Sequence, residues 1–207
     1  LLTTGEFRNR YLAQEKESIN GKIIKINFKN KDFKIISMGH RNPQGLLYDK
    51  ENNIILSTEH GPEGGDEINL IDLDLLSSNN HKILNYGWPI SSYGEHYGGK
   101  KKFANREKYK KYPLYKSHSK HNFIEPLKFF TPSIGISEIT KIDEKKYIAS
   151  SLKAKSIYLF ELNELNEMIN LEMINVYERV RDIKFKNKNL YLFLENTGSI
   201  GVIRLPQ

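Results

Sequence analysis

Cysteine is absent from this sequence, and its absence removes several kinds of site at once. Without a thiol the chain forms no disulfide bond, holds no zinc–thiolate centre and uses no cysteine nucleophile. Long apolar runs are absent too, and none approaches the length of a membrane span. The missing cysteines fit the cytoplasm and the periplasm equally well, so composition alone does not decide the compartment.

Arginine is scarce beside lysine, and the net charge of +7 is therefore carried mostly by lysine. A positive balance raises the question of a nucleic-acid partner. The lysine runs Lys100–Lys102 and Lys108–Lys111 lie in polar segments, however, where they are typical of a solvated surface. We therefore expect no nucleic-acid partner, and each arginine becomes worth separate attention.

What the sequence does contain is a series of short alternating apolar runs, which predict β-strands. Turn residues separate these runs. The strands are expected at residues 1–4, 21–27, 46–49, 54–59, 67–71, 139–142, 147–150, 156–162, 183–185, 190–195 and 200–205. The chain is therefore predicted to be all-β.

Two of the strand sets repeat each other with a period of roughly 44 residues, which separates Tyr147 from Tyr191. That period is typical of one four-stranded blade of a β-propeller, whose sheets stand radially around a central channel. The fourth strand is expected from residues 168–177 or from the chain end, and residues 46–71 look like a third set. The sequence holds three to four blades on this interpretation, and an all-β sandwich is the alternative.

The single predicted domain, residues 1–207, contains one stretch where the periodicity lapses. Residues 87–130 are rich in Tyr, Lys and Gly and are predicted to form a long inserted loop, of the kind that is often functional. The first run, Leu1–Thr4, is already strand-like and does not begin with Met. We therefore expect the chain to be the C-terminal part of a longer propeller protein.

Three loop-like clusters carry polar side chains between the strands, in Gly- and Pro-rich turns that fix unusual backbone shapes. Polar groups held on turns over a sheet are how binding sites are commonly built. The clusters are Gly39–Gly45, Glu59–Glu67 and Asn85–Pro89.

These clusters carry a resemblance to a known family. With Leu2–Gly5, Gly21–Ile23, Pro132–Ile134, Ser151–Lys153 and Arg179–Asp182, they follow the order of motifs in the soluble sugar dehydrogenases that depend on pyrroloquinoline quinone (PQQ). The chain thus resembles the glucose/sorbosone dehydrogenase family of six-bladed β-propellers. It departs from the family pattern at residues 135–138, and Glu6 stands where the family has an Asp.

The resemblance implies that PQQ, which carries three carboxylates, is held by cationic and hydrogen-bonding side chains. The matching positions are Arg41, Asn42, Gln44, Ser133, Lys153, Arg179 and Arg181. In the family the residue at Arg41 also stabilises charge that develops at the reactive carbonyl, which is an electrostatic catalytic role. Surface ion pairs are the alternative for the arginines, and a turn role is the alternative for Asn42. Arg179 and Arg181 are two apart on an expected strand, so both should face one side.

Calcium is the second cofactor that the resemblance implies. The backbone carbonyls of Gly61 and Pro62 match the family's ligands to a calcium on the quinone, and calcium prefers oxygen ligands. A second, structural calcium is implied at Glu67 and the Tyr86 carbonyl, although residues 72–84 between them are expanded. A surface carboxylate is the alternative for Glu67.

Histidine is where the chain falls short of the implied mechanism. In the family a His general base takes the proton of the sugar's anomeric hydroxyl while hydride passes to the quinone, which gives a lactone. None of the six His residues sits in the motif of that base, so we expect the chain alone to be inactive. His40 and His60 could suggest zinc, but no third ligand has suitable spacing, and His40 is expected to be a packed or hydrogen-bonded loop residue. Trp88, the single Trp, is expected in the core.

The resemblance further implies a small sugar as substrate, an external electron acceptor and a periplasmic or secreted location. Two other functions stay open at this point. A non-catalytic β-propeller that binds sugar or protein fits the departure at residues 135–138 and the Lys-rich insertion. A propeller hydrolase of the lactonase kind would need a metal cluster of Glu, Asn and Asp, which the sequence does not assemble.

Overall fold

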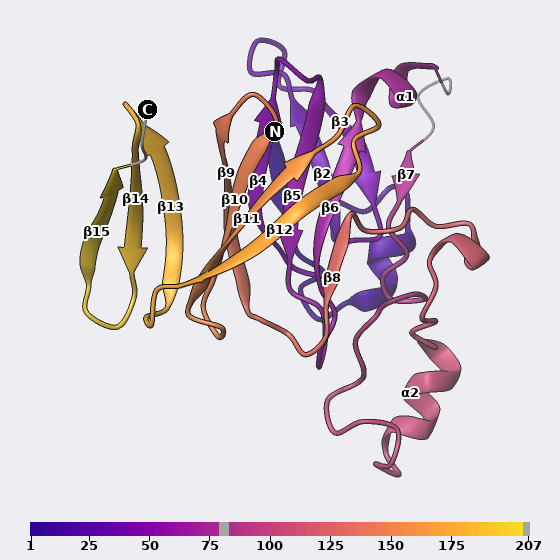
Figure 1. Cartoon of the computed structure of the whole chain (residues 1–207). Coiled ribbons are helices and arrows are strands. Elements are labelled where there is room, and N and C mark those ends of the chain that lie inside the picture. The colour runs from indigo at the N-terminus through magenta and orange to yellow at the C-terminus, as the bar shows by residue number, and fades with distance from the viewer. Residues whose placement is uncertain (79–82, 205–207) are drawn as a thin grey trace.

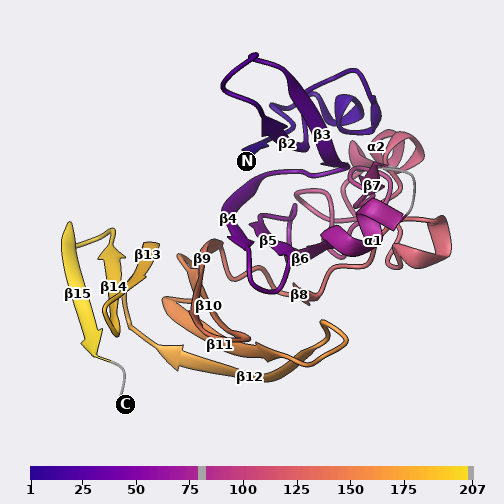
Figure 2. The same ribbon diagram turned by 90° about the horizontal axis from the view of Figure 1, so that it is seen from above.

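The structure of the chain is a computed structural model that describes residues 1–78 and 83–204. Strands dominate these ranges, and they form four sheets that follow one another along an arc (Figures 1 and 2). The first sheet contains, in spatial order, β1 (Leu2–Thr4), β2 (Lys22–Ile26), β3 (Phe33–Met38) and β7 (Leu84–Asn85). The second contains β4 (Pro43–Asp49), β5 (Ile54–Glu59), β6 (Asp66–Asp72) and β8 (Lys128–Phe130).

The C-terminal third forms the two remaining sheets. The third sheet contains, from the outside inwards, β12 (Met168–Asn175), β11 (Ser156–Leu162), β10 (Lys146–Ser151) and β9 (Ile136–Asp143). The fourth contains β13 (Val180–Lys186), β14 (Asn189–Leu194) and β15 (Ser199–Arg204). Short helices complete the described ranges: η1 (Arg10–Gln14), α1 (Leu73–Ser78), α2 (Asn105–Lys111) and η2 (Ser119–His121).

The arrangement of the sheets is that of β-propeller blades. Strands β4, β9 and β13 lie on the inner side of the arc in Figure 2, while β8 and β12 lie on its outer side. Neighbouring inner strands contact one another, β1 with β4, β4 with β9, and β9 with β13. A sandwich would stack two sheets face to face instead. The predicted β-propeller with three to four blades is therefore confirmed.

Most predicted strands are present, but three observed strands were not predicted, one of them the two-residue β7. The segment 168–177 does supply the outer strand of the third sheet, as β12, and residues 46–71 do form a third set, as β4 to β6. Strand β3 was not predicted, and β8, at the end of the insertion, completes the second sheet by pairing with β6. Residue Leu205 of the last predicted strand lies outside the described residues, as do 79–82 of the expanded 72–84 segment.

The apolar core lies between neighbouring blades. Successive residues of a strand point to opposite faces, and β5 shows the consequence. Ile54 and Leu56 pack with Tyr147 of the third sheet, whereas Ile55 packs with Ile23 of the first sheet. A further cluster joins the third sheet to the fourth. Each fully buried side chain of this size contributes roughly 1.5–3 kcal/mol relative to exposure, so the core fixes how the blades sit against each other.

A buried carboxylate also ties the second blade to the third. Asp49, at the end of β4, is 3% exposed. It accepts hydrogen bonds from the Tyr147 hydroxyl at 2.7 Å, the Lys141 ammonium at 2.9 Å and the Asn52 amide at 2.7 Å. Burial acts to raise the pKa of Asp49, but these bonds lower it to about 2. The charge is tolerated inside because every partner is in place.

All the loops that carry predicted site residues lie at one end of the blades, the lower end in Figure 1. Strands β4, β9 and β13 begin at this end, whereas β5, β10 and β14 finish there. Strand β1 also finishes there, because the Glu6 N–H donates to the Arg41 carbonyl at 2.8 Å. The irregular insertion and α2 extend from the same end. Within residues 1–78 and 83–204, no helix has the length and apolar character to cross a bilayer.

Candidate functional site

The first cluster places Arg41 between β3 and β4. Gly39 makes the preceding bend with φ +75°, and a Cβ there would lie 2.2 Å from Asn85 Oδ1. The Arg41 guanidinium donates to the His60 carbonyl at 2.8 Å and lies 5.5 Å from the centre of the Trp88 ring. Its Nε atom is buried and has no hydrogen-bond partner among the described residues. Arg41 is thus a fixed cation with a donor left over.

Histidine and tryptophan in these clusters are structural. His40 is fully buried, with Ser37 and Glu59 each 2.8 Å from a ring nitrogen, and it stacks on Tyr86. The prediction of a packed, hydrogen-bonded loop histidine is confirmed. The Nε2 atom of His60 lies 2.5 Å from the Ile136 carbonyl, so this ring is hydrogen-bonded to the protein as well. Trp88 is 3% exposed and packs in a small apolar cluster, as predicted.

The second cluster folds around Asp66, a residue to which the sequence analysis gave no role. One carboxylate oxygen accepts from the Gly61 N–H at 3.1 Å, and the other accepts from the N–H groups of Gly135 at 2.6 Å and Ile136 at 3.1 Å. Gly61 is required here, since a Cβ would lie 2.1 Å from the Gly65 carbonyl oxygen. The only signal in the sequence is an Asp directly before a strand, next to a Gly pair.

The carbonyls of the predicted calcium ligands remain available. In the described part of the chain no hydrogen bond reaches the Gly61 carbonyl. The Pro62 carbonyl meets only the Ser133 hydroxyl, which donates across 3.5 Å. Uncharged carbonyl oxygens are donors that calcium accepts. Gly61 and Pro62 therefore fit the ion, and the Ser133 hydroxyl lies beside the Pro62 carbonyl.

Ser133 and Lys153 are brought together at the start of β9 and the end of β10. The Lys153 N–H donates to the Ile134 carbonyl at 2.9 Å, and Gly135 has φ +63° with its ideal Cβ 2.9 Å from Lys153 N. Both side chains line one surface hollow of about 490 Å³. The Lys153 side chain is exposed and has no ion-pair partner among the described residues. An anion at this end can therefore reach it.

The residues that depart from the family pattern join three blades. The Thr58 hydroxyl of β5 donates to the Ser137 carbonyl of β9 at 2.6 Å. The Ser137 hydroxyl donates to the Val180 carbonyl of β13, also at 2.6 Å. Residues 135–138 thus hold the predicted site loops at a fixed spacing.

Arg179 and Arg181 face the same side, as expected from their spacing. Their guanidinium groups both bind Glu195, at 3.1 Å and 2.5 Å. Their side chains are 35% and 51% exposed, so solvent and a ligand can reach them. The surface ion pair that was the alternative is present, with both guanidinium groups on one carboxylate.

Asn42 and Gln44 contact each other at the start of β4. The Gln44 amide donates to Asn42 Oδ1 at 3.1 Å and to the Pro43 carbonyl at 3.3 Å. The His60 N–H donates to the Asn42 carbonyl at 3.0 Å. The side-chain amide nitrogen of Asn42 donates no hydrogen bond within the described ranges, so it is free to donate to a ligand. The backbone carbonyl of Asn42 meanwhile fixes the loop by accepting from His60.

Glu67 and Tyr86 meet at a small cavity of about 10 Å³, which Arg41 and Gly61 also border. Glu67 is 4% exposed, so it is not a surface carboxylate. Burial, and then the charge of Glu59, raise the pKa of Glu67 well above its usual value. Another wall of this cavity is His118, which comes from the insertion. Nothing in the sequence pattern pointed to that residue.

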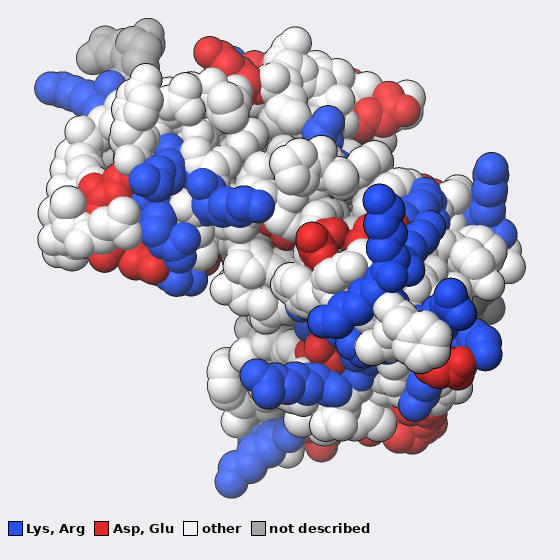
Figure 3. Space-filling view, turned by 90° about the horizontal axis from the view of Figure 1, so that it is seen from below, with Lys and Arg blue, Asp and Glu red and all other residues white. Residues whose placement is uncertain are grey.

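Most of the predicted site residues therefore form three groups at one end of the blades. Arg41, Gly61, Glu67 and Tyr86 surround the small cavity, Ser133 and Lys153 share a hollow, and Arg179 pairs with Arg181 through Glu195. Figure 3 shows this end, where Lys and Arg side chains gather on both sides of a notch in the surface.

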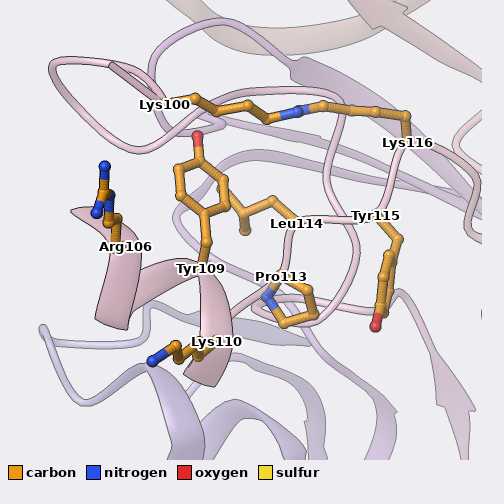
Figure 4. Close-up of a pocket in the computed structure, with 8 residues that line it drawn as sticks. All are labelled: Lys100, Arg106, Tyr109, Lys110, Pro113, Leu114, Tyr115 and Lys116. Atoms are coloured by element: carbon orange, nitrogen blue, oxygen red, sulfur yellow. The ribbon is translucent and has the colours of Figure 1, made fainter. Parts of the chain in front are cut away.

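The insertion adds a separate hollow of about 630 Å³ at this end (Figure 4). Its walls include Tyr109 of α2 and the side chains of Lys100 and Lys116. The Tyr109 hydroxyl donates to Glu95, which also pairs with Lys116 at 3.0 Å. None of the predicted cofactor residues lines this hollow.

The chain is similar in sequence to several known proteins. The model of the Glucose / Sorbosone dehydrogenase family matches residues 1–203. "Uncharacterized protein slr1608" from Synechocystis is 32% identical over 195 residues, with 84% of this chain and 42% of that protein covered. Quinoprotein glucose dehydrogenase B from Acinetobacter calcoaceticus is 43% identical over 65 residues, covering 31% of this chain and 12% of that protein.

A crystal structure of a glucose dehydrogenase superposes with a TM-score of 0.79 at 24% identity. It covers 100% of this chain and 60% of its own length, and at that identity it establishes the fold alone. The chain thus spans 42% of the length of slr1608 and 60% of the length of this glucose dehydrogenase.

Proposed function

We propose, from the premise that this chain belongs to the glucose/sorbosone dehydrogenase family, that it forms the cofactor-binding part of a sugar dehydrogenase that uses PQQ and calcium. The observation that carries the proposal is the Arg41 guanidinium, whose buried Nε has no partner among the described residues. An unpaired buried donor on a cation is costly unless a ligand satisfies it. An oxygen atom of the quinone is such a ligand.

The other cations suit the same ligand. Lys153, Arg179 and Arg181 lie at the same end of the blades and are open to solvent. Guanidinium groups bind carboxylates through two parallel N–H bonds, which fixes orientation as well as affinity. We assign these three residues to the quinone carboxylates, and Asn42, Gln44 and Ser133 to its remaining oxygens.

The Gly61 and Pro62 carbonyls would hold the calcium. When bound, the two cofactors would supply a polarised quinone carbonyl that accepts hydride from the sugar. Arg41 would stabilise the negative charge that develops there, because its position is fixed by the His60 carbonyl before any ligand arrives. The Asp66 carboxylate keeps the Gly61 turn rigid through three backbone N–H groups.

Proton transfer is assigned to a histidine outside this chain. Among the described histidines, His40, His60 and His96 are hydrogen-bonded to protein groups. The His118 side chain is 1% exposed, and His121 stacks on Tyr115. His81 lies outside the described residues. We therefore propose that the chain alone is inactive. A small sugar, an external electron acceptor and a periplasmic or secreted location complete the proposal, with the insertion shaping the sugar's entrance.

The test is a quinone titration of this chain with its natural flanking sequence, with calcium and with a chelator. We expect tight, calcium-dependent binding with a shift of the quinone absorbance, followed by sugar-dependent dye reduction. Failure to bind quinone under either condition would reject the proposal and favour a non-catalytic propeller that binds sugar or protein.

A further inference from the structure

His118 lies where the family resemblance places a second calcium. The residues that supply the two implied ligands, Glu67 and Tyr86, border the same small cavity. The His118 ring borders it too, with Nε2 3.7 Å from Glu67 Oε1. We propose that the His118 side chain takes the place of this calcium, so that the protein binds calcium only at Gly61 and Pro62.

The insertion holds the His118 ring firmly in this position. The side chain is 1% exposed, and Tyr93 stacks on it with the ring centres 5.3 Å apart. Tyr93 in turn stacks on Phe129 of the neighbouring sheet at 3.7 Å. On the other side, the Ile124 N–H donates to the Asn85 carbonyl at 2.8 Å, which ties the His118 loop to the residue before Tyr86. Moving the ring out would break its stack on Tyr93, although neither ring nitrogen has a hydrogen-bond partner among the described residues.

A calcium ion does not fit beside this ring. Calcium takes six to eight oxygen ligands at about 2.3–2.6 Å, and imidazole nitrogen is not among them. The space that remains is about 10 Å³, roughly what one water molecule needs. A bound ion with its waters would require more room than the ring leaves.

The other carboxylates near the cavity already have hydrogen-bond partners within the protein. Glu59 binds His40 with one oxygen and the Arg41 N–H with the other, at 2.8 Å and 3.1 Å. Asp66 holds three backbone N–H groups. Only Glu67 is left for a cation, and in the described ranges no group of three acidic or histidine side chains is arranged around a metal.

Counting calcium tests this inference, on this chain with its natural flanking sequence. By equilibrium dialysis, the wild-type protein with PQQ should bind one calcium per chain, and Glu67→Gln should leave that number unchanged. His118→Ala opens the cavity and should raise the count to two, and Glu67→Gln in that background should return it to one. His121→Ala is the matched control, because His121 lies in the same loop but stacks on Tyr115.

Two results would overturn the proposal. One is a wild-type protein that binds two calcium ions and loses one on Glu67→Gln. The other is a folded His118→Ala variant that gains no calcium. If His118→Ala does not fold, terbium luminescence of the wild-type protein, excited through Tyr86 or Trp88, tests the inference instead. Emission that Glu67→Gln abolishes contradicts the inference. Emission that Glu67→Gln leaves unaffected supports it.

The inference rests on the proposed function only for the calcium at Gly61 and Pro62. If quinone and that calcium fail to bind, the proposed function falls. The comparison between wild type, His118→Ala and the double variant still measures calcium at Glu67 alone. The two failures are therefore distinguishable.

Discussion

Removing the Arg41 guanidinium is the most direct test of the cofactor site. Among the described residues its side chain has one hydrogen-bond partner, the His60 carbonyl, and its buried Nε has none. A structural arginine would use its donors within the protein, whereas a ligand-binding arginine keeps some of them free. The Arg41→Ala variant therefore separates the two roles.

The expected magnitude follows from the interaction that is lost. A hydrogen bond to a charged group contributes about 1.5–3 kcal/mol, and each 1.4 kcal/mol corresponds to about a tenfold change in affinity. Arg41→Ala should therefore weaken PQQ binding roughly 10- to 150-fold. Arg41→Lys keeps the charge but loses the planar pair of donors, so its affinity should lie between those of wild type and Arg41→Ala.

The assay is a PQQ titration in calcium, read by the quinone absorbance, with a thermal melt of each variant alongside. Arg10→Ala is the control, because its guanidinium lies 5.3 Å from the centre of the same Trp88 ring but pairs with His96. Wild-type affinity in Arg41→Ala would refute the assignment. So would an equal loss in Arg10→Ala, since the effect would then come from packing on Trp88.

Three further predictions concern other parts of the chain. Burial acts to raise the pKa of Asp49, but its hydrogen bonds lower the pKa to about 2, below the value in the unfolded chain. The ionised carboxylate therefore stabilises the fold above about pH 4, and about 2 kcal/mol of this stabilisation is lost as the pH falls toward 2. Thermal melts of Asp49→Asn in acid should lack this pH dependence. Gly65→Ala should lower the free energy of unfolding by about 1–3 kcal/mol or more, because its Cβ would lie 2.2 Å from Gly94 N. The Cβ of Gly99→Ala would meet nothing within 4 Å, so that variant should lose only about 1–2 kcal/mol, for its positive φ. Equal melting temperatures of the two variants would contradict this prediction. Arg179→Ala should weaken PQQ binding about tenfold or more. Glu195→Gln removes a competing carboxylate and should tighten PQQ binding. Weaker PQQ binding by Glu195→Gln would show instead that Glu195 positions the cations.

Alternation of apolar residues predicted strands well where each strand keeps a regular pleat. Strands β5 and β11 have the predicted bounds, and both are flanked by antiparallel neighbours. Strand β3 was missed because Ile35 and Ile36 are adjacent and break the alternation, and its pairing with β2 has a register shift at Ile23 and Ile24. Strand β8 has three residues and pairs with a strand some sixty positions earlier in the sequence, which no local pattern reveals.

The site was predictable as far as it lies in motifs, and not where partners come from distant segments. Arg41 and Gly61 stand in Gly-rich loops whose motifs match the family, and the resemblance implies their role. His118 lies in the insertion, where periodicity lapses, and its contact with Glu67 arises only when the loop folds back over the second sheet. The pairing of Arg179 with Glu195 likewise depends on which strands become neighbours.

Asp66 explains why the same turn can offer ligands to a cation. Its carboxylate takes the N–H groups of Gly61, Gly135 and Ile136, so an internal anion neutralises the donors at this point. The carbonyls of the turn are then left with little competition: the Gly61 oxygen has no hydrogen bond in the described part of the chain, and that of Pro62 has one long bond. Each residue other than proline carries one backbone donor and one backbone acceptor. Because the Asp66 carboxylate binds donors on one side of the turn, the Gly61 and Pro62 carbonyls stay available for a cation on the other side.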